Sequence, residues 1–123
     1  MSMIDTPLMR GLERVLDVST FRQQLLAANL ANVDTPGYRT RDVRPFGSEL
    51  EQAMSSGDEY PVMTPAAHAV RGLLERPDGN NVSVERETLL MAQNQLRFQV
   101  AVQFLRKQFS ELSTAINGGG SAS

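Results

Sequence analysis

The chain has 123 residues, no cysteine, one histidine and a formal net charge of −2. Its length suits one small domain, and the lack of cysteine excludes disulfide scaffolds, thiol nucleophiles and thiolate metal sites. The slightly negative charge argues against a nucleic-acid binder, which needs a concentrated basic surface.

The same counts disfavour several other functions. A single histidine excludes a site that needs two imidazoles from one chain, and we expect no metal and no other cofactor. Residues 1–7 lack the basic and apolar regions of a secretory signal, so we expect no cleaved signal peptide. No run approaches the roughly 18 apolar residues of a membrane-spanning helix. These features weaken most enzyme hypotheses, and we expect a protein that is not an enzyme.

A long helix is predicted at the start of the chain. Thr6 is a suitable N-cap, and Pro7 suits the first helical position, where its missing N–H costs nothing. Apolar and small residues recur at three- and four-residue spacing up to Val33. Their overlapping stripes form a face wider than one partner helix covers. The helix would span about 28 residues, or roughly 40 Å.

A sharp turn is predicted directly after this helix. Thr35 precedes a proline, which disfavours the helical region for its backbone. Pro36 and Gly37 suit the two central positions of a type II turn, in which the glycine supplies the positive φ. We therefore expect the chain to change direction between Asp34 and Tyr38, and this turn to set the angle at which the chain leaves the helix.

The middle of the chain, residues 39–82, is predicted to be weakly organised. Ser48 suits the N-cap of a short helix that ends at Met54. Residues 70–75 and 82–84 favour a small β-hairpin around a turn at residues 77–81. A basic cluster in this segment fits either a solvated loop or an interface with a phosphate or an acidic partner; it consists of Arg39, Arg41 and Arg44.

Two isolated features of the middle segment carry little chemistry. His68 lies between two alanines, whereas a catalytic base would need a nucleophile and an orienting group. We interpret it as a surface or packing residue. Asp78-Gly79-Asn80 resembles the start of a calcium loop, but the twelfth position counted from Asp78 is Leu89 rather than a glutamate. A turn is the better interpretation.

A second long helix is predicted near the C-terminus. Ser83 suits its N-cap, and Glu85 and Glu87 complement the helix dipole in the first turn. Apolar residues occupy the a and d positions of a heptad from Met91 to Ile116, and Gln95 is the one polar residue among them. A flanking apolar stripe comprises Leu89, Leu96, Val100 and Phe104. Gly118 is a natural C′ stop, and a flexible tail would follow it.

These elements predict a mainly α fold in which the two long terminal helices pair as an antiparallel coiled coil. The divisions of this single unit are residues 1–38, the irregular middle 39–82, the C-terminal helix 83–117 and the tail 118–123. The residues expected to make the packing surfaces are Leu12, Leu16, Leu26, Leu30, Val33, Met91, Phe98, Val102, Leu105, Phe109, Leu112 and Ile116. Two helices cannot bury all of these stripes, so we expect packing against other copies or other chains.

One motif and two segments resemble a known family. The stretch 26–38 closely resembles the signature of bacterial flagellar rod, hook and hook-associated proteins. Residues 78–87 and 94–99 resemble segments at the C-terminal helix of the short proximal-rod members, with Phe98 where a tyrosine is usual. The positions that match the signature are Asn29, Ala31, Asn32, Asp34, Thr35, Pro36, Gly37 and Tyr38. The chain has no room for the large β-rich domain that hook and distal-rod members insert between their helices.

The resemblance implies a structural protein. Subunits of this family leave the cell uncleaved through the flagellar export gate and assemble helically into the rod that crosses the periplasm and transmits torque. Their terminal helices are largely disordered before assembly. The implied partners are further copies of the chain, the rod subunits FlgC, FlgF and FlgG, the adaptor FliE and the MS-ring protein FliF. Phe21 and Leu25 resemble the short export-gate recognition element of such substrates.

Two alternatives remain at the level of the sequence. The chain could be a subunit like FlgC, the sister proximal-rod protein, which is similar in size. A soluble helical-hairpin adaptor or export chaperone would also have two striped helices, and it would be folded and helical as a dilute monomer or dimer.

Overall fold

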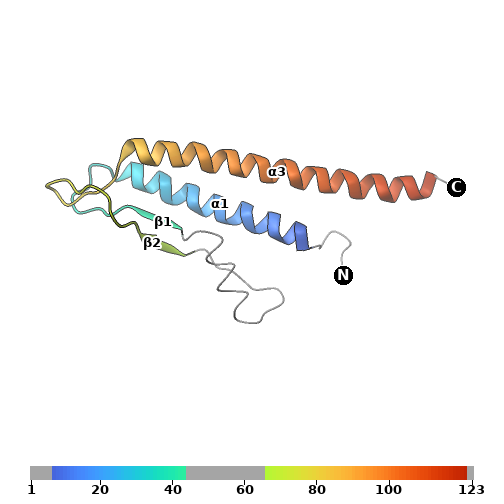
Figure 1. The fold of residues 1–123 in the computed structure, drawn as a ribbon, viewed down its shortest axis with the longest axis horizontal. Coiled ribbons are helices and arrows are strands. Elements are labelled where there is room, and N and C mark those ends of the chain that lie inside the picture. Colours follow the sequence, from blue (N-terminus) through green and yellow to red (C-terminus); the bar gives the residue numbers. More distant parts are fainter. Residues whose placement is uncertain (1–6, 44–65, 122–123) are drawn as a thin grey trace, which may run out of the picture.

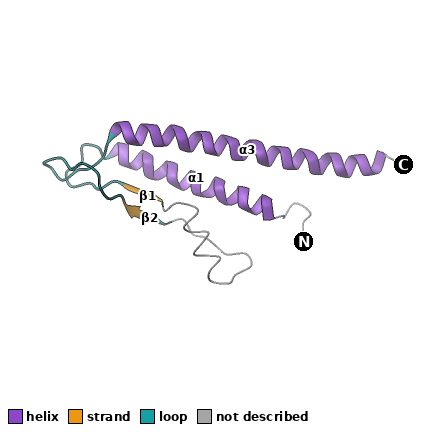
Figure 2. Cartoon of the chain, viewed as in Figure 1, coloured by secondary structure: helices purple, strands orange, loops and turns teal. Residues whose placement is uncertain are grey.

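Two long helices dominate the chain (Figure 1). The computed structural model describes residues 7–43 and 66–121. In chain order the elements are α1 (Pro7–Ala31), β1 (Arg41–Val43), β2 (Ala67–Ala69) and α3 (Val84–Ser121). The helices lie side by side and antiparallel, while the described loops gather at one end (Figure 2). The predicted mainly α fold with two paired terminal helices is confirmed.

Helix α1 spans 25 residues and ends two residues before Val33. The helix tightens at this end, because the Val33 amide donates to the Leu30 carbonyl at 3.2 Å, three residues back instead of four. Nδ2 of Asn32 adds a bond of 2.8 Å to the Ala28 carbonyl in the last turn. The Thr35 amide then donates to the Asn32 carbonyl at 3.0 Å, which continues the chain as a turn. Pro7 is the first helical residue as predicted, whereas Thr6 lies outside the described residues.

The predicted turn at Pro36 and Gly37 is confirmed. Gly37 has a φ of 75°, and the Tyr38 amide donates to the Thr35 carbonyl at 3.1 Å. A proline followed by a glycine with positive φ, closed by this bond, is the pattern of a type II turn. The turn sends the chain back along α1 toward β1.

The small sheet differs from the predicted hairpin. β1 pairs with β2 in antiparallel register, with Asp42 opposite His68. The hairpin expected between residues 70–75 and 82–84 was wrong, because Asn80 and Asn81 bond to the loop after α1 instead of to residues 70–75. The short helix expected from Ser48 to Met54 lies outside the described residues.

Helix α3 spans 38 residues and extends past the start of α1 (Figure 1). Ser83 caps it as predicted, since its Oγ accepts from the Arg86 amide at 3.3 Å. The predicted stop at Gly118 was wrong, and the helix continues into the segment expected to be a flexible tail. Among the described glycines, those with positive φ are Gly37, Gly72 and Gly79, so Gly118 keeps a helical backbone.

Candidate functional site

The signature residues lie in a polar junction, which we define as the residues 29–42 and 76–87 where α1 ends and α3 begins. Asn29 is at its centre and is fully buried. Its Nδ2 donates to the Arg41 carbonyl at 2.8 Å and to Oε2 of the buried Glu87 at 2.9 Å. Its Oδ1 accepts from the Tyr38 hydroxyl and from the Arg41 amide, both at 3.1 Å. One amide side chain therefore ties α1, the loop, β1 and α3 together.

A second buried asparagine joins the two loops of the junction. Nδ2 of Asn80 donates to the carbonyls of Asn32 and Thr35, both at 2.9 Å. Its Oδ1 accepts from the Val82 amide at 2.8 Å, which fixes the approach to α3. The Thr35 hydroxyl donates to Oδ1 of Asn32 at 3.0 Å and holds the signature loop in the shape that Asn80 binds.

The backbones of the two loops also approach each other closely. The Gly37 amide donates to the Asp78 carbonyl at 2.8 Å. Gly79 has a φ of 87°, and a Cβ there would lie 3.3 Å from the Gly37 Cα. Arg76 donates to the carbonyls of Val33 and Val82 from its two terminal nitrogens. Both glycines are therefore favoured by their positive φ, and Gly79 also by the lack of space for a side chain.

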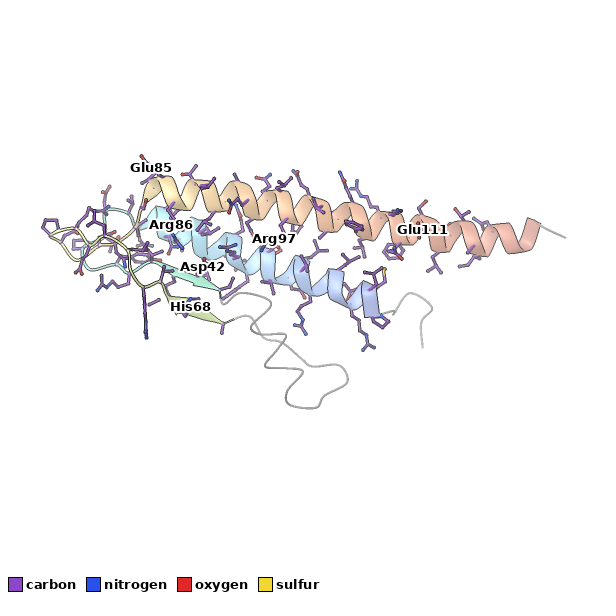
Figure 3. The ribbon with its side chains drawn as sticks, in the orientation of Figure 1. Asp42, His68, Glu85, Arg86, Arg97 and Glu111 are labelled. Atoms are coloured by element: carbon purple, nitrogen blue, oxygen red, sulfur yellow. The ribbon has the colours of Figure 1, made fainter. Side chains whose placement is uncertain are left out.

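Four charged side chains form a chain of ion pairs across the junction. Arg22 of α1 binds Asp42 of β1 through two bonds of 2.9 Å. Arg86 of α3 lies 4.0 Å from the same carboxylate and binds Glu87 at 2.8 Å. Figure 3 shows Asp42 and Arg86 near each other at this end, while Arg97 and Glu111 lie farther along α3. Asp42 and Glu87 are buried, and a buried carboxylate without an opposite charge beside it would destabilise the fold, so the two arginines stabilise the junction.

The junction uses only part of the predicted signature set. Asn29, Asn32, Thr35, Gly37 and Tyr38 make the contacts described above. Ala31, Asp34 and Pro36 are exposed at its surface. The hydrogen bonds and ion pairs of Arg22, Asp42, Asn80 and Glu87 were not predicted from the sequence, and Glu87 was interpreted only as a charge that complements the helix dipole. One signal pointed to Glu87: it lies at heptad spacing from Asn94 and Ala101, so the three residues share one face of the helix.

The contact between the helices runs along a seam of polar and small residues on α3. Glu87, Asn94 and Ala101 are buried, and Gln108 is half-buried, each seven residues from the next. The predicted seam paired the 91, 98, 105 and 112 positions with 95, 102, 109 and 116. In the structure, the residues at 91, 98, 105 and 112 lie beside the seam. The other predicted positions, 95, 102, 109 and 116, are not the centre of the contact, which is formed by positions 87, 94, 101 and 108. The polar residue that faces α1 is therefore Asn94 rather than Gln95. Asn94 and Glu87 find hydrogen-bond partners on α1, which Gln95 would not reach.

Large apolar side chains are instead exposed along α3. We define Leu89, Leu96, Val100 and Phe104 as the outer stripe, and all four are exposed. Of the predicted packing residues, Leu26 is fully buried, whereas Phe98, Phe109 and Ile116 are exposed in the single chain. The half-buried ones are Leu12, Leu16, Leu30, Val33, Met91, Val102, Leu105 and Leu112. The helix pair thus places polar and small groups inside and much of its apolar surface outside.

The remaining predicted features are dispersed. Phe21 and Leu25 are half-buried on α1, and His68 is exposed on β2 (Figure 3). Arg39 pairs with Glu75 at 3.3 Å, and Arg41 is exposed on β1, while Arg44 lies outside the described residues. Leu74, in the loop between β2 and α3, is 90% exposed.

Within residues 7–43 and 66–121, no group of three or more acidic, histidine or cysteine side chains is placed to hold a metal ion. In that same part of the chain, no helix combines the length and apolar character needed to cross a bilayer.

Comparison with known proteins identifies relatives over most of the chain. Residues 21–39 match the family model described as flagella basal body rod protein. The flagellar basal body rod protein FlgB of Salmonella typhimurium is 32% identical over 130 residues, which cover 90% of this chain and 94% of that protein. FlgB of Cereibacter sphaeroides is 39% identical over 110 residues, with 79% and 84% covered. FlgB of Bacillus subtilis is 29% identical over 123 residues, with 89% and 93% covered.

Proposed function

Since this chain belongs to the flagellar basal body rod protein family and is a structural subunit of the rod, we propose that the outer stripe of α3 is the surface it buries in assembly. The relatives are rod proteins named FlgB, which favours that role over a FlgC-like subunit or a soluble adaptor. The chain is accordingly a structural protein and not an enzyme.

The exposed outer stripe is the observation that carries this proposal. Leu96 is 62% exposed, and its neighbours Val100 and Phe104 extend the same surface along the helix. Monomeric proteins rarely leave a contiguous apolar surface of this kind in water. Burial against neighbouring subunits would gain hydrophobic stabilisation that the single chain lacks, so folding and assembly are coupled.

The junction supplies the second requirement of a rod, which is resistance to deformation. Its buried asparagines bond to backbone groups of three different segments, so the ends of the helices cannot move apart without breaking several bonds together. Long helices that are clamped at one end and packed against neighbours would transmit torque.

The finer assignments follow from family membership. The partners we propose are further copies, FlgC, FlgF, FlgG, FliE and FliF, and the export gate during secretion. The chain would be exported without cleavage and would assemble into the part of the rod that crosses the periplasm. We propose Phe21 and Leu25 as the element that the export gate recognises. Both are half-buried in α1, so the gate would bind them while this helix is unfolded.

A charge placed on the outer stripe tests the proposed surface. Leu96→Asp should abolish rod assembly and motility while circular dichroism of the isolated chain stays unchanged, because Leu96 contributes little to the fold of the single chain. Thr88→Asp is the matched control, since Thr88 is an exposed polar residue of the same helix that lies outside the face of the outer stripe. Normal motility with Leu96→Asp would contradict the proposal.

A dilution series tests the coupling of order to assembly. Far-UV circular dichroism and light scattering on the same samples should show helicity rising as large particles form. Helicity that stays constant over the whole series, with no large particles formed, would show that the stripes are satisfied within one chain.

A further inference from the structure

α3 has two apolar faces, and one of them lies toward α1. α3 presents Glu87, Asn94 and Ala101 to α1, with the half-buried Met91, Leu105 and Leu112 beside them, while the outer stripe with Leu96 and Val100 faces away. Either face could bury apolar surface against α1, so hydrophobic burial alone does not select one of them. A specific interaction is therefore needed to hold α3 with its seam toward α1.

Asn94 supplies such an interaction two turns beyond the junction. Its side chain is buried, with 3% exposed. Its Nδ2 donates to the Ser19 carbonyl at 2.8 Å and to Oε1 of Gln23 at 3.0 Å. Rotation of α3 would place apolar side chains opposite Gln23 and remove the donor from its half-buried amide oxygen, and such unpaired polar groups are costly.

Close packing does not provide an equivalent constraint at this level. An open hollow of about 400 Å³ lies between the helices, lined by Ser19, Gln23, Asn94 and Phe98 among others. Side chains that interlock without gaps would fix the rotation of a helix by shape, but here the walls are partly separated. The bonds of Asn94 are the specific contacts between the helices across this hollow.

We propose that Asn94 is a specificity-determining residue, which selects the face of α3 that contacts α1. A buried asparagine between paired helices is a known way to specify one arrangement at some cost in stability. Here it keeps the polar seam inside and leaves the outer stripe free. With leucine at position 94, Gln23 lacks this donor in either orientation, so no polar contact at this level favours the seam over the outer stripe.

Thiol reactivity can measure which face is buried, because the chain has no cysteine of its own. Val100 is 44% exposed and its neighbour Ala101 is 4% exposed. Two single-cysteine proteins, Val100→Cys and Ala101→Cys, report the two faces. In the otherwise unchanged chain, the cysteine at 100 should react roughly tenfold or more faster than the cysteine at 101, since the latter reacts only after local opening.

Asn94→Leu should bring this ratio of rates to one or below, with helicity unchanged. Gln23→Leu, which removes the side-chain acceptor from the other helix, should move the ratio in the same direction. Thr88→Leu is the control, because Thr88 is an exposed polar residue of α3 outside the lining of the hollow, and it should leave the ratio unchanged.

The other outcomes overturn the proposal. An unchanged ratio in Asn94→Leu would show that the junction alone fixes the orientation. A loss of helicity in that variant would make Asn94 a requirement for pairing rather than a selector of the face. A ratio near one in the unsubstituted background would mean that the seam is not buried in solution. The measurement concerns the isolated helix pair, so each of these results would leave the rod assignment intact.

Discussion

At the scale of single residues, the signature motif acts through a few side chains that contact distant parts of the chain. The amide of Asn29 makes two donated and two accepted bonds, and the partner Glu87 lies 58 positions away. The sequence alone predicted the turn at Gly37 and the cap at Ser83, because both depend on local backbone preferences. It could not predict the pairing of Asn29 with Glu87, since this arises only when α1 and α3 lie side by side.

Asn29→Asp should strongly destabilise the junction. The new carboxylate would replace the Nδ2 that lies 2.9 Å from Oε2 of Glu87, so two buried negative charges would face each other. We expect a loss of roughly 3–5 kcal/mol in the free energy of unfolding, as for other uncompensated buried charges. Urea titration followed by circular dichroism measures it. Asn117→Asp, at an exposed position of α3, is the control and should change little.

Gly79→Ala should cost more than Gly72→Ala. Both glycines have positive φ, which costs an L-residue roughly 1–2 kcal/mol. Only the Cβ at position 79 would also press on the Gly37 backbone, whereas position 72 faces open space. Unfolding free energies of the two variants give the comparison, and equal losses would show that the loops do not cross closely in solution.

At the scale of elements, the helices were predictable and the sheet was not. Apolar spacing and capping residues predicted the first residue of each helix to within a few positions. The strands were misassigned because the apolar residues 70–75 and 82–84 fit a hairpin pattern, while Asn80 and Asn81 are drawn away by bonds to the loop at residues 32–40. Such side-chain competition depends on tertiary contacts and leaves little trace in local spacing.

Gly118→Ala distinguishes the observed helix end from the predicted one. A helical glycine replaced by alanine gains about 1 kcal/mol of helix stability, and nothing lies within 4 Å of the new Cβ. We expect increased helicity and slower amide exchange in residues 112–117. If Gly118 instead had the left-handed conformation of a helix stop, alanine would reduce both.

At the scale of the whole molecule, the sequence predicted the excess of apolar surface but not where it lies. The heptad assignment put the large residues between the helices, because pattern alone favours the most apolar seam. The structure puts Asn94 and Ala101 there and leaves Leu96 and Val100 outside. Buried polar bonds decide this choice, and they depend on which residues of α1 lie opposite.

A leucine buried within the single chain and a leucine of the outer stripe should respond differently to truncation. Leu26→Ala removes a fully buried side chain and should cost roughly 2–5 kcal/mol in the isolated chain. Leu96→Ala should cost within about 0.5 kcal/mol there, as surface changes do, yet weaken assembly. Unfolding titrations and light scattering separate the two effects. A large loss of stability from Leu96→Ala in dilute solution would show that the outer stripe is already covered.

The exposure of Leu74 has a practical consequence for imaging. The start of α1 and the end of α3 lie toward the opposite end of the molecule from the junction loops (Figure 1), and Leu74 belongs to the loop between β2 and α3. A cysteine in place of Leu74 would be a unique thiol for a fluorescent dye, since the chain has no other. The dye would sit on a loop held by the junction, and its orientation would report rotation of the rod directly.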